Sequence, residues 1–150
     1  MTKLTEHFSF AEMTRSQTAT RKGIRNVPSV EATKALILLC EKVLEPVRAH
    51  FGAPVRISSG YRSPRLNTAI GGSRSSQHCK GEAADFTLPG VSNIDVVRWM
   101  HAKLNYDQLI YEYGESGWIH CSYSAHRMRN AELTARRARG GTKYLMGIVI

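Results

Sequence analysis

Apolar residues recur at helical spacing over the longest patterned stretch of the chain, which runs from Ser29 to about His50. The repeating apolar positions are Leu36, Leu39, Val43 and Val47. Intervals of three or four residues place such side chains on one face of an α-helix, so the pattern predicts a long amphipathic helix. Ser29 is a favourable N-cap, and Pro46 is expected to kink the helix or to end its regular part.

Shorter segments complete the predicted order of elements. Helices are predicted over residues 8–13, 64–70 and 93–104. The segment 14–28 is polar and is predicted to form an irregular connection. Runs rich in apolar, β-branched and aromatic residues predict strands over residues 54–58, 83–86, 108–113 and 117–123. The apolar chain end at residues 144–150 is expected to pack against the body, with a strand as one option and an exposed interaction segment as the alternative. The fold class predicted is α+β.

Length and composition favour one soluble domain over residues 1–150, because 150 residues with 42% hydrophobic content can bury a real core. The chain lacks a run of about 18 apolar residues that would span a membrane. Its first residues also lack the apolar stretch of a secretory signal, so synthesis in the cytoplasm without a signal peptide is expected.

The net charge of +9 is concentrated near the C-terminus. Residues 125–150 carry six Lys or Arg against one Glu, whereas residues 31–124 carry ten basic against nine acidic residues. The six basic residues are Arg127, Arg129, Arg136, Arg137, Arg139 and Lys143. This segment could contact an anionic wall polymer, the lipopolysaccharide of an outer membrane or nucleic acid, or it could be a solvated basic face. We expect no stable nucleic-acid partner and a monomeric protein.

The residues with the clearest chemistry are His78, Asp85 and His120. Two imidazoles and one carboxylate are donors that suit Zn²⁺, and three protein ligands leave one coordination position open for water. His78 is expected in a loop, where Gly81 permits a turn that other residues resist, while Asp85 and His120 are expected on strands. An open position of this kind predicts a catalytic zinc site.

The three cysteines leave an alternative open, because Cys79 and Cys121 adjoin candidate ligands and either could be read as a thiolate ligand. Successive strand residues point to opposite faces, so Cys121 should enter the core if His120 faces the metal. Cys40 lies among apolar residues of the predicted long helix and is expected to be buried there. With an odd number of cysteines and no close pair, a disulfide framework is not expected.

These residues belong to a longer pattern, S-x-H-x-x-G-x-A-x-D followed by W-x-H. Its fixed positions are filled by Ser76, His78, Gly81, Ala83, Asp85, Trp118 and His120, and the segment Ser59-Gly60-Tyr61-Arg62-Ser63 lies upstream. The pattern resembles the zinc D,D-carboxypeptidases and endopeptidases that cut peptidoglycan peptides, the peptidase M15 family. The resemblance covers roughly residues 30–124. In size and layout the chain is most similar to single-domain endolysins of bacteriophages.

The resemblance implies a small hedgehog/D,D-peptidase-like fold, with an antiparallel sheet flanked by helices. It implies that His78, Asp85 and His120 bind one zinc ion and that Arg62 orients the peptidoglycan peptide, a role that suits a guanidinium because it can grip a carbonyl or carboxylate with two hydrogen bonds. The catalytic body would span about residues 30–124, followed by the basic segment 125–150. Such an enzyme would act on peptidoglycan in the periplasm or cell wall after release by another factor.

Hydrolysis at zinc also needs a general base, and Glu112 and Glu115 compete for that role. If a five-residue connection joins the last two predicted strands, Glu112 lies opposite Trp118 and shares the face that carries His120. Glu115 is expected at an exposed turn. Relatives that place a Glu three residues before the ligand His have it where this chain has Gly117. We therefore predict Glu112 as the base.

Two functions follow from this pattern. The first is a zinc peptidase that hydrolyses an amide bond in stem peptides or cross-links, with Glu112 moving the proton and Arg62 helping to hold the oxyanion. The second is a noncatalytic zinc module that binds cell wall or another polyanion, because the hedgehog signalling domains share the fold. The presence of both Arg62 and a candidate base favours the enzyme. Pocket shape, which sequence does not reveal, decides which bond is cut.

Overall fold

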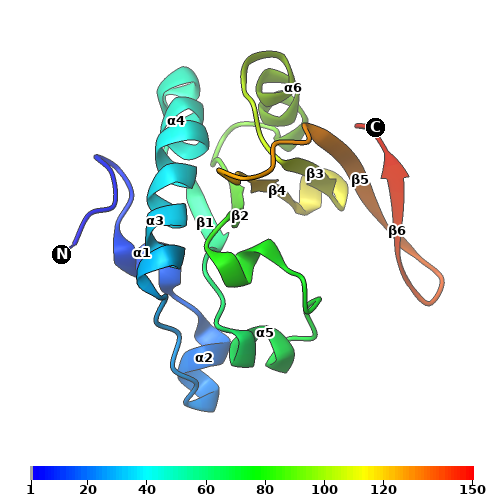
Figure 1. Ribbon diagram of the computed structural model, residues 1–150. Coiled ribbons are helices and arrows are strands. Elements are labelled where there is room, and N and C mark those ends of the chain that lie inside the picture. The colour runs from blue at the N-terminus through cyan, green and yellow to red at the C-terminus, as the bar shows by residue number, and fades with distance from the viewer. Residues whose placement is uncertain (1) are drawn as a thin grey trace.

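A six-stranded sheet organises the chain, in the order β1-β2-β4-β3-β5-β6 (Figure 1). The structure is a computed structural model, and it describes residues 2–150. The strands are β1 (Arg56–Ser59), β2 (Ala83–Thr87), β3 (Gln108–Glu112), β4 (Trp118–Ser122), β5 (Ala131–Ala138) and β6 (Gly141–Met146). Every neighbouring pair is antiparallel except β3 and β5, which run parallel. The predicted α+β class is confirmed.

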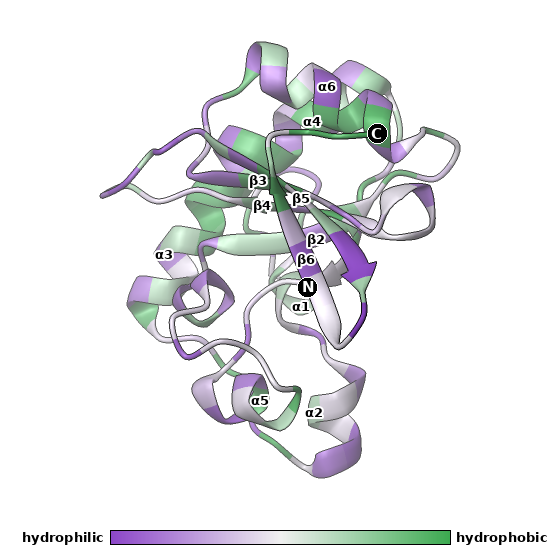
Figure 2. Ribbon diagram, turned by 90° about the vertical axis from the view of Figure 1, so that its right-hand side faces the viewer, coloured by the Kyte–Doolittle hydropathy of each residue, from purple (hydrophilic) through white to green (hydrophobic). Residues whose placement is uncertain are grey.

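The helices lie against this sheet and around its lower end (Figure 1). They are α1 (Phe10–Thr14), α2 (Gln17–Lys22), α3 (Val30–Leu39), α4 (Glu45–Phe51), α5 (Pro64–Ala69) and α6 (Asn93–Lys103). A π-helical segment, Cys40–Leu44, joins α3 to α4, and 3₁₀ turns occupy Gln77–Lys80 and Gly114–Ser116. In Figure 2 the hydrophobic stretches concentrate where α4 and α6 meet the sheet, while α2 is mostly polar.

The long helix predicted after Ser29 is present, and its regular part ends before Pro46 as expected. The Ser29 side chain accepts a hydrogen bond from Ala32 N–H, which satisfies one of the free donors of the first turn. Proline has no N–H, and its ring crowds the carbonyl four residues earlier. The chain accommodates Pro46 by widening into the π-helical segment, in which Glu45 N–H bonds to the Cys40 carbonyl.

Strand alternation separates a core face of the sheet from a polar face. The core side chains of β2, β3 and β4 are Ala84, Phe86, Leu109, Tyr111, Ile119 and Cys121, all packed with the apolar faces of α3, α4 and α6. The intervening residues of the same strands therefore project from the opposite face. Asp85, Glu112, Trp118 and His120 are among these residues and line one cavity. A well-packed core on one side thus supports a polar cavity on the other.

Two segments differ from the prediction. Residues 14–28, predicted as irregular, contain the helix α2, which Ser16 caps at its start and Gly23 ends in a left-handed conformation. Only Ala19 of this helix is buried, so the apolar period that reveals longer helices is missing. Residues 131–138 form β5, although no element was predicted for them; their sequence AELTARRA is rich in residues that favour helices.

The C-terminal end continues the sheet. β5 pairs with β3 on one side and with β6 on the other, so the two strands of the segment 125–150 extend the same sheet that holds the core. The strand option for residues 144–150 is confirmed as far as Met146, and Ile148 beyond it packs against the core. Ile150 is 77% exposed, so the last residue does not share that burial. Across residues 2–150, no helix combines the length and apolarity that crossing a membrane requires.

The turn at Gly81 packs so closely against α3 that a larger residue there should lower the stability of the protein. Gly81 has a φ of +72°, and a Cβ there would lie 2.2 Å from the Ala32 carbonyl oxygen of α3. Gly90 also has a positive φ, +79°, but a Cβ at that residue would have no atom within 4 Å. Alanine at either position has a conformational cost of about 1 kcal/mol. Crowding adds roughly 1–3 kcal/mol at Gly81 alone.

Urea denaturation of Gly81→Ala and Gly90→Ala should therefore give a clearly larger loss of unfolding free energy for Gly81→Ala. Equal losses would contradict the close packing of this turn against α3.

Candidate active site

Asp85 and His120 face each other across two central strands. Their Cα atoms are register partners of β2 and β4, a position that brings directly opposite side chains within contact. Asp85 Oδ1 lies 2.9 Å from His120 Nδ1. Both residues lie one step out of phase with the core positions Ala84 and Cys121, which explains why the ligand candidates point away from the core.

His78 reaches the same point from the 3₁₀ turn. Ser76 Oγ accepts from the His78 backbone N–H, and Gly81 ends the turn in a left-handed conformation. The His78 ring is oriented by the carbonyl of Gly60, which lies 2.7 Å from its Nδ1. Because a carbonyl only accepts hydrogen bonds, Nδ1 carries a proton, and Nε2, once it is deprotonated, is the atom that can bind a metal. That Nε2 lies 3.4 Å from Asp85 Oδ2.

These three side chains form a group that can hold a metal ion. One ligand atom from each of His78, Asp85 and His120 lies within 4.8 Å of the others. Ligand atoms about 2.1 Å from a tetrahedral zinc would be about 3.4 Å apart. Asp85 Oδ2 lies 3.4 Å from His78 Nε2, and the other oxygen, Oδ1, lies 2.9 Å from His120 Nδ1. Among the residues that the structure describes, Cys79 does not join the group. Cys40 and Cys121 are buried, as predicted, and all three cysteines are free.

The electrostatics of the group keep Asp85 ionised. Burial by itself would raise the pKa of this carboxyl, but hydrogen bonds from His120 and His78, together with their charges, hold the pKa well below its usual range. For His120, burial acts to lower the pKa, and the hydrogen bond and charge of Asp85 outweigh it and raise the pKa. A negative carboxylate beside two imidazoles is an arrangement that a divalent cation would stabilise further.

Arg62 lies beside this group and is held by neutral partners. Its Nε donates to Ser59 Oγ at 3.0 Å and its Nη1 to Asn67 Oδ1 at 3.4 Å. Its Nη2 lies 3.5 Å from Asp85 Oδ2. The side chain is 17% exposed, so the guanidinium is fixed at the wall of the cavity instead of extending into solvent.

Asn26 is a supporting residue that the sequence did not reveal. Its side-chain amide donates to the carbonyls of Thr14 and Tyr61, and its Oδ1 accepts from Ser63 N–H at 2.7 Å. These bonds fix the backbone on both sides of Arg62. Asn26 lies in the segment predicted as an irregular connection, and nothing in the local sequence distinguishes it from an ordinary loop residue.

Glu112 lies where the five-residue connection predicts. It is the register partner of Trp118, and its Oε1 lies 3.9 Å from His120 Nδ1. Burial, followed by the charge of Asp85, raises the pKa of Glu112 to about 7. The Trp118 indole N–H is buried without a well-formed hydrogen bond, but it lies near enough to Glu112 to oppose this rise. A carboxyl of this kind can exchange protons near neutral pH.

Glu115 lies in the 3₁₀ turn, exposed as predicted, and serves the fold. Its carboxylate accepts hydrogen bonds from the backbone N–H groups of Asn93 and Ile94 and from the Tyr111 hydroxyl. It therefore supplements the N-cap residue Ser92 by accepting from two further N–H groups at the start of α6. The glycine at position 117 also has a steric cause, since a Cβ there would lie 1.8 Å from the Glu112 carbonyl oxygen. A glutamate at that position does not fit this hairpin.

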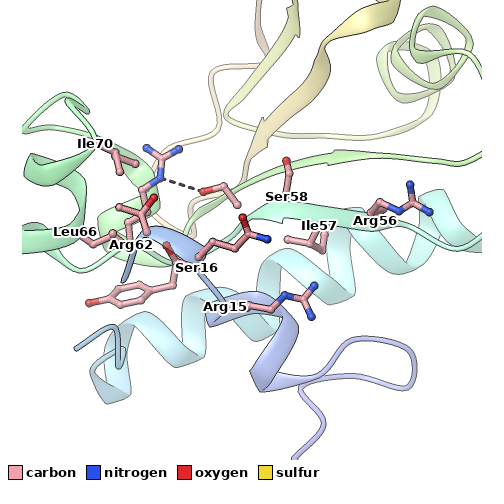
Figure 3. Close-up of a pocket in the computed structure, with 12 residues that line it drawn as sticks. Arg15, Ser16, Arg56, Ile57, Ser58, Arg62, Leu66 and Ile70 are labelled. Carbon is pink, nitrogen blue, oxygen red and sulfur yellow. Dashed lines mark hydrogen bonds between the residues drawn. The ribbon is translucent and has the colours of Figure 1, made fainter. Parts of the chain in front are cut away.

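The site opens into a cavity of about 560 Å³ that contains the metal-ligating group, Arg62 and Glu112. Arg62 also lines a neighbouring cavity of about 550 Å³, between the start of α2, β1 and α5. Figure 3 shows this second cavity, with Arg62 at one end and Arg56 at the other. Two adjoining cavities of this size give room for an extended peptide on both sides of Arg62.

Removal of one metal-ligating side chain should abolish tight metal binding. Losing even a residue that only orients a ligand costs about 10- to 100-fold in affinity, so His120→Ala should lose more than about 100-fold. Equilibrium dialysis against Zn²⁺ or Co²⁺ measures this change. The matched control is His126→Ala, which removes an exposed histidine outside the group. Comparable affinities in the two variants would contradict the proposed ligand set.

Replacing Glu115 with alanine should destabilise the protein by about 1 kcal/mol, because the N–H groups of Asn93 and Ile94 lose their acceptor while the N-cap Ser92 remains. Thermal or urea denaturation measures the loss, and metal affinity should stay at the wild-type value. A variant with wild-type stability would show that the capping contacts of Glu115 are not significant in solution.

Comparison with known proteins extends these observations. The family model of peptidase M15 matches residues 6–122, a range that contains His78, Asp85, His120, Arg62 and Glu112. A search of curated proteins found no match to the chain. Because the match covers well over half of the sequence, the chain belongs to the peptidase M15 family and is a peptidase.

Proposed function

We propose that the protein is a zinc-dependent peptidase that hydrolyses an amide bond in the stem peptides or cross-links of peptidoglycan. The observation that carries the proposal is the adjacency of Glu112 to an open group of three potential ligands. A purely structural metal site uses four protein ligands and needs no neighbouring base. Membership of a peptidase family agrees with the catalytic alternative.

The donor set supports zinc as the cofactor. His78 Nε2, His120 Nδ1 and one oxygen of Asp85 would hold a single ion, and this combination of nitrogen and oxygen donors suits zinc. When bound, zinc would polarise the scissile carbonyl and lower the pKa of a water molecule toward 7.

Glu112 is assigned the proton transfers. Its carboxylate would take a proton from the attacking water and later deliver it to the nitrogen of the leaving amine. The position suits both steps, since Glu112 is buried beside His120 yet lines the cavity into which a peptide would bind. Glu115 is excluded from this role because its carboxylate is directed to the start of α6.

Arg62 is assigned the orientation of the substrate. Its guanidinium is already fixed by Ser59 and Asn67, so little conformational entropy is lost when it binds a carbonyl oxygen. A cation held at this wall also stabilises the negative charge that develops on that oxygen during hydrolysis. A lysine at this position carries a compact charge without the planar fork of a guanidinium. It would not hydrogen-bond to Ser59, Asn67 and the substrate at the same time.

The biological setting proposed is that of a phage-type endolysin, supported by the layout of the motifs along the chain. The protein would be made in the cytoplasm and would reach peptidoglycan in the periplasm or cell wall after release by another factor. D-Ala carboxypeptidase action, cleavage between L-Ala and D-Glu and cleavage of a cross-link all use the same chemistry. Mass spectrometry of the released fragments identifies the bond.

The decisive pair of variants is Glu112→Gln and Glu115→Gln, each zinc-loaded and assayed on purified peptidoglycan. Glu112→Gln should lose about 10²- to 10⁴-fold in hydrolysis, because it cannot accept a proton, while still binding zinc. Glu115→Gln should remain active. Loss of activity in the Glu115 variant alone would overturn the assignment of the base. Absence of hydrolysis by the zinc-loaded wild type on several wall types would favour a binding module instead.

A further inference from the structure

The segment between β4 and β5 adds a positively charged group to the active-site cavity. Arg127 and Arg129 both line the cavity that contains the metal-ligating group and Glu112. Both lie after residue 122, where the match to the family model ends, so the family assignment does not account for them. They also belong to the basic segment 125–150, whose positive charge has no role in the proposed hydrolysis.

One buried carboxylate organises this pair. Asp107 is fully buried, and Arg129 binds it in a bidentate manner, with Nε at 2.8 Å from Oδ1 and Nη2 at 2.9 Å from Oδ2. Burial alone would raise the pKa of Asp107, but the hydrogen bonds and charges of Arg129, with the charge of Arg127, hold the pKa below its usual range. Asp107 is therefore ionised and neutralises one of the two guanidinium groups.

The second guanidinium remains as a surplus charge. Arg127 makes one longer contact, from Nη2 to Asp107 Oδ2 at 3.3 Å, and its side chain is 54% exposed. Since Arg129 occupies both oxygens of Asp107 at shorter distance, the positive charge of Arg127 is available to a ligand in the cavity.

Hydrogen bonds to the chain just before β3 hold the segment in place. Arg129 N–H donates to Asp107 Oδ1, Ala131 N–H donates to the Asp107 carbonyl, and Asn130 exchanges hydrogen bonds with Tyr106. Asn130 adopts a left-handed conformation, with a φ of +50°, which asparagine tolerates better than most residues that have a side chain. The loop is thus attached to the residues just before β3, and the Arg127 N–H itself donates to the Ser124 carbonyl.

We propose that Arg127 is a specificity-determining residue that binds a free carboxylate of the peptide substrate, with Asp107 and Arg129 as the residues that position it. A guanidinium recognises a carboxylate by paired, charge-assisted hydrogen bonds. Peptidoglycan stem peptides offer such groups at the α-carboxylate of D-Glu and at the peptide C-terminus. The proposal rests on the proposed function, since it names the part of the same substrate that this wall of the cavity contacts.

The test compares synthetic stem peptides in which one carboxylate at a time is converted to a carboxamide. Binding is measured by calorimetry on the zinc-loaded Glu112→Gln protein, with and without Arg127→Gln, so that no turnover is needed. With Arg127 present, one of the two carboxamide peptides should bind about 10-fold more weakly than the parent peptide. With Arg127→Gln that ratio should fall to about one. The peptide that loses affinity identifies which carboxylate is bound.

Arg139→Gln is the matched control, because it removes the same charge from an exposed position outside the cavity. The 10-fold ratio should survive in this variant. An unchanged ratio in Arg127→Gln, or an equal loss in Arg139→Gln, would overturn the assignment of Arg127 while leaving the proposed hydrolysis intact. Conversely, a wild-type protein that cuts no peptide but shows the Arg127-dependent ratio would overturn the hydrolytic function and keep the carboxylate site.

Discussion

The buried carboxylate of Asp85 is the constraint on which the site depends. An ionised group removed from water is costly unless opposite charges or donors surround it, and here His78, His120 and Arg62 converge on its two oxygens. Each partner is fixed by a different part of the chain: a glycine-ended turn, a neighbouring strand and the loop after β1. The metal-ligating group is therefore assembled by tertiary structure around one strand residue.

Alternation along the strands makes this arrangement compatible with a stable core. Phe86, Ile119 and Tyr111 pack under the helices, and the residues between them carry the chemistry on the other face. The hairpin connection then decides which glutamate enters the site. The connection has five residues, and Gly117 permits it because only a residue without a Cβ fits so close to the Glu112 carbonyl. Glu112 is thereby directed toward His120, and Glu115 accepts hydrogen bonds from the start of α6. Fold and candidate chemistry thus follow from the same register.

Much of this could be predicted from the sequence, because strong periodicity and a spaced motif report local rules. The long helix, the central strands, the burial of Cys121 and the pairing of Glu112 with Trp118 all follow from period and parity. The parts that sequence did not reveal depend on distant partners. β5 has the composition of a helix and becomes a strand because it can pair in parallel with the edge of β3. The hydrogen bonds from Asn26 to Thr14 and Tyr61 form only in the folded chain.

The basic C-terminal segment shows the same limit, since charge counts alone did not separate Arg127 from the solvated residues beyond it.

The central claim is that His78, Asp85 and His120 hold one metal ion with an open position. X-ray absorption spectroscopy at the zinc edge of the loaded protein tests it most directly. The expected result is nitrogen and oxygen scatterers at about 2.0–2.2 Å, with the outer-shell signal of two imidazoles. A sulfur scatterer at about 2.3 Å, which would bring Cys79 into the site, would contradict it.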